Sequence, residues 1–80
     1  MDPQVSLHEL LAAVDAHDWE RAEELSTELL NWMQRRGFPP TTVGPLTLGK
    51  GWHRAVATFI CHLATSEARR ARKRRRRFKP

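Results

Sequence analysis

The chain has 80 residues, one cysteine and a formal net charge of +5, so it has room for one small domain and cannot form an intrachain disulfide. Its longest apolar stretch, residues 55–63, is broken by polar side chains and is too short to span a bilayer. The acidic, polar start at residues 1–4 lacks the features of a signal peptide. We therefore expect a cytoplasmic protein, or a nuclear one in a eukaryotic cell.

The charge is distributed very unevenly. Residues 1–68 carry five bases and nine acids, a balance of −4, whereas residues 69–80 carry nine bases and no acid, a balance of +9. This split predicts a domain over residues 1–68 followed by an arginine-rich tail over residues 69–80. Such asymmetry indicates an anionic partner, either nucleic acid or another polyanion.

The first predicted helix spans about residues 7–16. Ser6 and Glu9 have the spacing of a capping box, in which each side chain bonds to the backbone N–H of the other residue. The following apolar residues share one helical face: Leu7, Leu10, Leu11 and Val14.

The second predicted helix spans residues 19–36, with Asp18 as its N-cap. Its apolar stripe consists of Ala22, Leu25, Leu29 and Met33. Gly37 follows where a left-handed residue commonly ends a helix, and Pro39 and Pro40 forbid continuation. The short turn between the two helices predicts an antiparallel hairpin.

The hairpin resembles one unit of the tetratricopeptide-repeat family over roughly residues 7–39. Residues 18–22, Asp-Trp-Glu-Arg-Ala, look like the opening of that family's second helix, and Pro39 follows the helix as it does there. The chain lacks the family's Trp and Gly-Tyr pattern in the first helix and has no second copy. The resemblance implies a helical hairpin that binds other proteins.

Residues 37–51 contain all four glycines and three of the five prolines, which predicts a connection. It is either a linker fixed to the core or a recognition loop with Phe38 exposed. Residues 44–50 match the Gly-x4-Gly-Lys part of a P-loop, but Gly51 stands where Ser or Thr is needed to hold Mg²⁺, and no strand pattern precedes them.

Neither catalysis nor a cofactor is predicted. His53 and His62 lie on opposite sides of one helix, so they do not form a metal site with Cys61. No combination of nucleophile, base and orienting acid can be assembled with any specificity. We therefore expect a protein that is not an enzyme and binds no metal.

The third predicted helix runs from about residue 50 to residue 70 or beyond. Its apolar stripe includes Trp52, Ala55, Val56, Phe59, Ile60, Leu63 and Ala64. These patterns predict a small all-α three-helix bundle with a basic C-terminal extension, which is either helical or disordered. The expected core is Leu7, Leu10, Leu11, Val14, Ala22, Leu25, Leu29, Met33, Trp52, Val56, Phe59, Ile60 and Leu63.

The basic run is the strongest functional signal. Its candidate phosphate-binding residues are Arg69, Arg70, Arg72, Lys73, Arg74, Arg75, Arg76, Arg77 and Lys79. Guanidinium groups stay charged and fork onto phosphate, so the run predicts nucleic-acid binding, with RNA slightly favoured over DNA. Deleting residues 69–80 is expected to abolish binding and leave the fold intact.

Other interpretations of the sequence remain open. The tail is a solvated charge run, a segment docked on the acidic ridge of Glu20, Glu24 and Glu28, or an attachment to an anionic membrane surface. The protein is then a small helical interaction adaptor, monomeric or homodimeric. Its candidate contact residues are Trp32, Phe38 and Trp52.

Overall fold

The computed structural model describes residues 2–77 of the chain, and the side chains of residues 2–74. Three α-helices, α1 (Pro3–Asp15), α2 (Trp19–Gln34) and α3 (Lys50–Arg77), are joined by turns and by a short 3₁₀ helix, η1 (Leu46–Leu48). The described residues include no strand. The all-α three-helix architecture predicted from sequence is thus confirmed.

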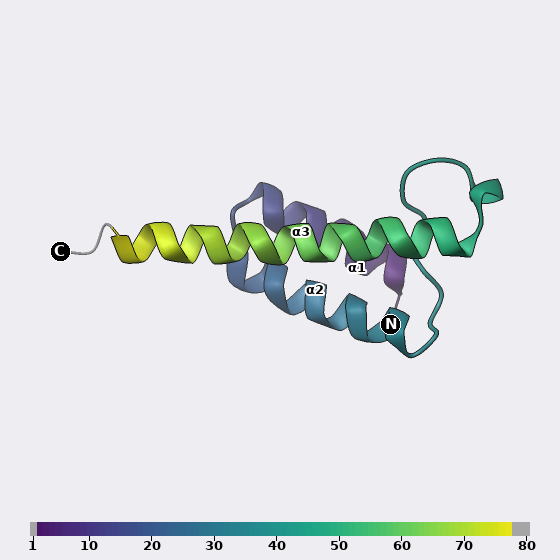
Figure 1. Ribbon diagram of the computed structural model, residues 1–80, viewed down its shortest axis with the longest axis horizontal. Coiled ribbons are helices and arrows are strands. Elements are labelled where there is room, and N and C mark those ends of the chain that lie inside the picture. Colours follow the sequence, from purple (N-terminus) through teal and green to yellow (C-terminus); the bar gives the residue numbers. More distant parts are fainter. Residues whose placement is uncertain (1, 78–80) are drawn as a thin grey trace.

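The helix α2 lies at the centre of the bundle. It packs against both α1 and α3, whereas α1 and α3 touch each other only slightly. In Figure 1, α1 and α3 run in the same direction and α2 runs in the opposite one. The buried apolar residues are Leu7, Leu10 and Ala13 on α1, Ala22, Leu25, Leu29 and Met33 on α2, and Ala57, Cys61, Ala64 and Ala68 on α3.

The start of α1 differs from the prediction. Asp2, not Ser6, is the N-cap, and its carboxylate accepts hydrogen bonds from the backbone N–H groups of Gln4 and Val5 at 3.0 and 3.4 Å. Pro3 occupies the first helical position, where its missing N–H has no cost. The predicted capping box at Ser6 and Glu9 is therefore wrong, because the helix has already completed its first turn there.

The ends of α2 are set by local hydrogen bonds. The Asp18 carboxylate accepts from the Arg21 N–H at 3.3 Å, which confirms the predicted N-cap. At the other end the left-handed residue is Arg36, with φ of 65°, and not Gly37. The N–H groups of Arg36 and Gly37 donate to the carbonyls of Met33 and Trp32, the two bonds of a Schellman motif.

Gly37 serves a different purpose from the predicted one. A Cβ atom at this position would lie 2.3 Å from the Trp32 ring. The absence of that atom lets the indole lie against the backbone, where its Nε1 donates to the Phe38 carbonyl at 2.8 Å. Gly37 thus permits a close approach and does not supply a left-handed turn.

The buried face of α3 also differs from the prediction. Trp52, Phe59 and Leu63 were expected in the core, but they are 47%, 65% and 51% exposed. Val56 is only half-buried. Ile60 is partly buried and packs against the core.

The side of α3 that faces the core instead carries small side chains. Its buried residues, each no more than 4% exposed, are His53, Ala57, Cys61, Ala64 and Ala68. On α1 the exposed Leu11, at 47%, is a further departure from the expected core, whereas Val14 packs at its edge.

The rotation of α3 about its own axis, which decides the face that it buries, is explained by how far the contact between α3 and α2 extends along the helix. The face that carries Trp52 and Phe59 continues about five turns later into Arg70, whose unpaired burial would be costly. The small-residue face remains free of charge as far as Ala68. The helix α2, which packs against α3, buries two small residues of its own, Ala22 and Ser26, and small side chains let packed helices approach closely.

The connection between α2 and α3 is fixed at several points. The Gln4 side chain bonds to both backbone polar groups of Thr41, at 2.8 and 3.3 Å. The buried His53 ring accepts from the Thr42 N–H through Nδ1 at 3.0 Å and bonds the Pro45 carbonyl through Nε2 at 3.1 Å. These bonds fix parts of the connection to the helices, while Phe38, the residue expected to be exposed in a recognition loop, is 67% exposed.

Candidate nucleic-acid interface

The candidate interface is the C-terminal part of α3. Of the two alternatives left open by the sequence, the backbone of residues 69–77 adopts the helical one. Alanine, arginine and lysine are all strong helix formers, and positive charge is favourable at the C-terminal end of a helix dipole. In Figure 1 this end of α3 projects past the turn between α1 and α2. The molecule is correspondingly elongated, at 52 × 22 × 17 Å.

Three residues of α3 attach the start of this segment to the hairpin. Ala68 is fully buried, and Ala71 is half-buried. Arg72 Nη2 donates to the carboxylate of Glu23 on α2 at 2.7 Å. These contacts direct the basic end of the helix along a line set by the bundle.

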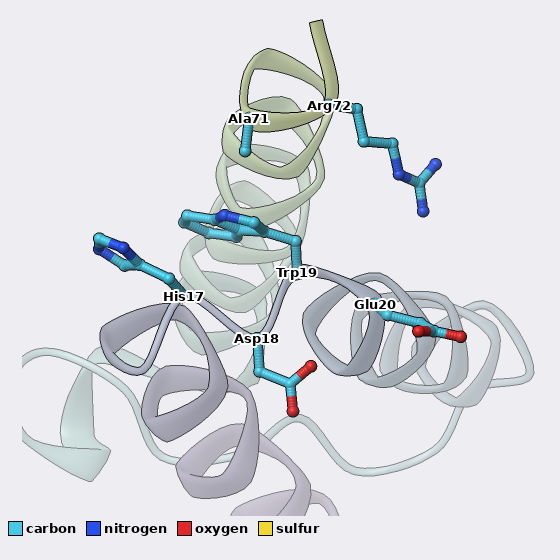
Figure 2. Close-up of a pocket in the computed structure, with 6 residues that line it drawn as sticks. All are labelled: His17, Asp18, Trp19, Glu20, Ala71 and Arg72. Carbon is cyan, nitrogen blue, oxygen red and sulfur yellow. The ribbon is translucent and has the colours of Figure 1, made fainter. Parts of the chain in front are cut away.

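A cleft of about 380 Å³ separates α3 from the turn between α1 and α2. It is lined by His17, Asp18, Trp19, Glu20, Ala71 and Arg72. Figure 2 shows the methyl group of Ala71 pointing toward the Trp19 indole. The His17 and Trp19 rings are stacked, with centroids 5.2 Å apart and planes inclined by 16°. The cleft mixes acidic, basic and aromatic groups, so it has no single charge preference.

The predicted phosphate-binding residues occupy different environments. Arg69, Lys73 and Arg74 are exposed. Arg70 Nη1 lies 3.1 Å from the Glu67 carboxylate, one turn earlier on α3. Arg72 is engaged by Glu23. The backbones of Arg75, Arg76 and Arg77 belong to α3 but their side chains are not described, and Lys79 lies outside the described residues.

The two arginine ion pairs are open to solvent. The side chains of Arg72 and Glu23 are 55% and 25% exposed, and those of Arg70 and Glu67 are 67% and 41% exposed. Pairs of this kind contribute about 0–1 kcal/mol. A phosphate group, which accepts a forked guanidinium contact, can therefore compete for either arginine.

The acidic ridge of α2 does not receive the described part of the tail. Glu24 pairs with Arg21 on its own helix at 3.3 Å, and Arg21 also reaches Glu9 on α1 at 3.2 Å. The acid that contacts the basic segment is Glu23, which stands beside the ridge.

The three candidate protein-contact residues are not equivalent. Phe38 is 67% exposed and lies under Lys50, whose Nζ is 5.1 Å from the ring centroid. Trp52 is half-exposed, and its Nε1 donates to the Val43 carbonyl at 2.7 Å. Trp32 packs against the core and is the least available of the three. The connection has three further exposed apolar residues, Val43, Leu46 and Leu48.

Cys61 and His53, which were considered as metal ligands, have structural roles in the fold. Among residues 2–77, no group of three His, Cys, Asp or Glu side chains is arranged to hold a metal ion. Cys61 is fully buried against α2, and this burial raises the pKa of its thiol to about 11. His53 is occupied by its bonds to the connection.

Sequence reasoning missed the exposed apolar face of α3, above all Phe59 and Leu63. The helix carries two apolar stripes, one of large and one of small residues, and hydrophobic periodicity favours the large one as the core face. A usable signal was present, because the small stripe continues through Ala68 while the large one gives way to Ser66 and Arg70.

Within the part of the chain that the structure describes, no helix combines the length and apolarity needed to cross a membrane. Comparison with protein-family models, with curated proteins and with solved structures gave no match for this chain.

Proposed function

We propose that this protein is a non-enzymatic nucleic-acid-binding protein whose arginine-rich end of α3 contacts phosphate groups. One observation carries the proposal. The basic segment continues a packed helix that projects past the hairpin (Figure 1), and its described side chains include the exposed Arg69, Lys73 and Arg74. The bundle thus holds a dense array of positive charge on a defined axis.

The affinity would come mainly from electrostatics. Each neutralised phosphate releases condensed counterions, so binding should weaken steeply with salt. Arginine-rich segments are a common means of RNA recognition, which slightly favours RNA. A helix also fits the major groove of B-form DNA. Both nucleic acids therefore belong in the test.

The test is a fluorescence-anisotropy titration of labelled RNA and DNA oligomers at several salt concentrations. The key variant is the triple substitution Arg69→Gln, Lys73→Gln and Arg74→Gln, which is preferable to deletion because Ala71 and Arg72 contact the hairpin. Its matched control is Arg35→Gln, Arg36→Gln and Lys50→Gln. The control removes the same charge from exposed positions at the opposite end of the molecule.

We expect the interface variant to lose most of its affinity at moderate salt, and its salt slope to fall by roughly two to three units. The control should retain most of the affinity and nearly the full slope. An equal loss of affinity in both variants would mean that binding depends only on net charge, and would contradict a defined interface. Absence of binding to either nucleic acid at low salt would reject the proposal.

The second candidate function is a protein-interaction adaptor. It is favoured by the exposed apolar residues of the connection, with Phe38 at 67% and Leu46 at 73% exposure. If the folded protein bound neither RNA nor DNA in the anisotropy titration, the adaptor would become the preferred function.

A further inference from the structure

The solvent-facing side of α3 carries an apolar stripe along its first half. Trp52, Phe59 and Leu63 are 47%, 65% and 51% exposed. They are spaced seven and four residues apart, so they lie one behind another on a single helical face. This stripe lies on the side of α3 turned away from the buried Ala57 and Cys61.

The same face becomes basic along its second half. Arg70 follows Trp52 by about five full turns, and Lys73 and Arg74 lie to either side of that line. All three are exposed. One continuous helical face therefore presents aromatic and aliphatic groups first and cationic groups next, with roughly 16 Å of helix between Phe59 and Arg70.

The charge around the apolar stripe is compatible with an anionic ligand. Residues 50–66 contain Lys50 and Arg54 but no acid. The nearest acid along the helix is Glu67, and Arg70 pairs with it at 3.1 Å. Glu67 lies between the basic and the apolar halves, so an anion that spans both passes this one acid, which is paired with Arg70, and meets no other negative charge along residues 50–66.

The two halves together select for a ligand that is polyanionic and also exposes flat apolar surfaces. A duplex offers the charge but keeps the faces of its bases stacked inside. A single strand offers both, and proteins that bind single strands combine basic tracks with aromatic side chains on which bases stack. Trp52 suits this role because its bond to the Val43 carbonyl, 2.7 Å, fixes the ring in place.

We propose that the solvent-facing side of α3 is a binding track for single-stranded nucleic acid. Bases contact Phe59 and Trp52, while phosphates contact Arg70, Lys73 and Arg74. This inference rests on the proposed function and adds to it a preference for single strands and an aromatic contact with the bases.

The experiment compares three labelled probes of equal length: an oligothymidylate, an abasic oligomer with the same phosphates, and a blunt duplex. The full-length protein is tested beside Phe59→Leu, which keeps apolar bulk but removes the aromatic face, and Phe59→Trp, which restores one. Val5→Ala is the control, because Val5 is a half-exposed apolar residue on α1. Circular dichroism verifies that each variant keeps its helices.

We expect the wild type to prefer the oligothymidylate over the abasic oligomer. Phe59→Leu should weaken oligothymidylate binding roughly tenfold and leave abasic binding unchanged, since one base–aromatic contact is lost. Phe59→Trp should restore the preference, and Val5→Ala should not alter it.

Two results separate this inference from the function on which it rests. If Phe59→Leu binds the oligothymidylate as the wild type does, while all probes still bind through the basic segment, the track is rejected and the proposed function stands. If no probe binds, both fail. Sedimentation of the wild type as a dimer that Phe59→Leu dissociates, with unchanged oligothymidylate affinity, would assign the face to a second copy and also reject the track.

Discussion

Glycine is required at position 37 because a neighbouring ring leaves no room for a side chain, and not because of the backbone conformation there. It stands directly after a left-handed residue, Arg36, whose φ is 65°. The position of Gly37 is constrained by the Trp32 ring, which lies where its Cβ would be. The contact closes the end of α2 and starts the connection to α3.

Substitution Gly37→Ala should therefore be destabilising. A Cβ 2.3 Å from the ring forces Trp32 to move and strains its hydrogen bond to Phe38. We expect a loss of about 2 kcal/mol in the free energy of unfolding, measured by urea denaturation. The control is Gly51→Ala in the first turn of α3, where a Cβ meets nothing within 4 Å. It should be neutral or stabilising by up to about 1 kcal/mol.

Cys61 provides a second test at the residue scale. Its thiol is fully buried, and burial raises its pKa from 9.0 to about 11. The thiolate is the reactive form, so the native protein should resist alkylation by iodoacetamide at about pH 8 and react readily when unfolded in urea. Rapid alkylation of the folded protein would contradict the orientation of α3.

The same shift has a consequence for stability. The folded state holds the proton more tightly than the unfolded state, so this thiol's contribution is fully present below pH 9.0. It is lost as the pH rises toward about 11.

At the scale of the element, the decisive feature is the rotation of α3 about its own axis. Its small residues face α2 and its large ones face solvent. When a helix has two apolar stripes, the buried one is the stripe that remains free of charged residues along the whole length of the contact. For α3 this is the stripe that ends in Ala64 and Ala68, because the other continues into Ser66 and Arg70.

Two alanines two residues apart test this rotation. Ala57 is fully buried, whereas Ala55 is exposed. We expect Ala57→Leu to cost about 2 kcal/mol or more by overpacking the contact with α2. Ala55→Leu should change the free energy of unfolding by less than about 0.5 kcal/mol. If Ala55→Leu were the more destabilising of the two in thermal or urea denaturation, the buried face of α3 would be the one expected from sequence.

At the scale of the whole molecule, the lengths of the helices differ. The hairpin helices have 13 and 16 residues, whereas α3 has 28. Since α3 extends about 1.5 Å per residue, it is roughly 42 Å long and projects beyond the hairpin. The projecting part carries the basic run, so the fold itself separates a packed body from a charged arm. The salt-dependent titration with charge-matched variants tests whether that separation has a binding role.

The sequence by itself determined the features that depend on neighbouring residues. The Asp18 cap, the stripe of α2 and the glycine- and proline-rich connection are local patterns, and each appears where expected. The charge split is a property of composition alone. The start of α1 was misplaced because two capping signals, at Asp2 and Ser6, lie within one turn and Pro3 favours the earlier one.

Only the tertiary structure decided which side of α3 is buried. Local periodicity allows either stripe to face the core, and the choice depends on the small surface of α2 and on keeping Arg70 in solvent. The same packing decides that Phe59 and Leu63 are exposed, and that Arg72 meets Glu23. The candidate track on α3 was not predicted from sequence for this reason: its apolar half has the periodicity of a core face, and the opposing signal, its continuation into Arg70, becomes decisive only once the extent of the contact with α2 is known.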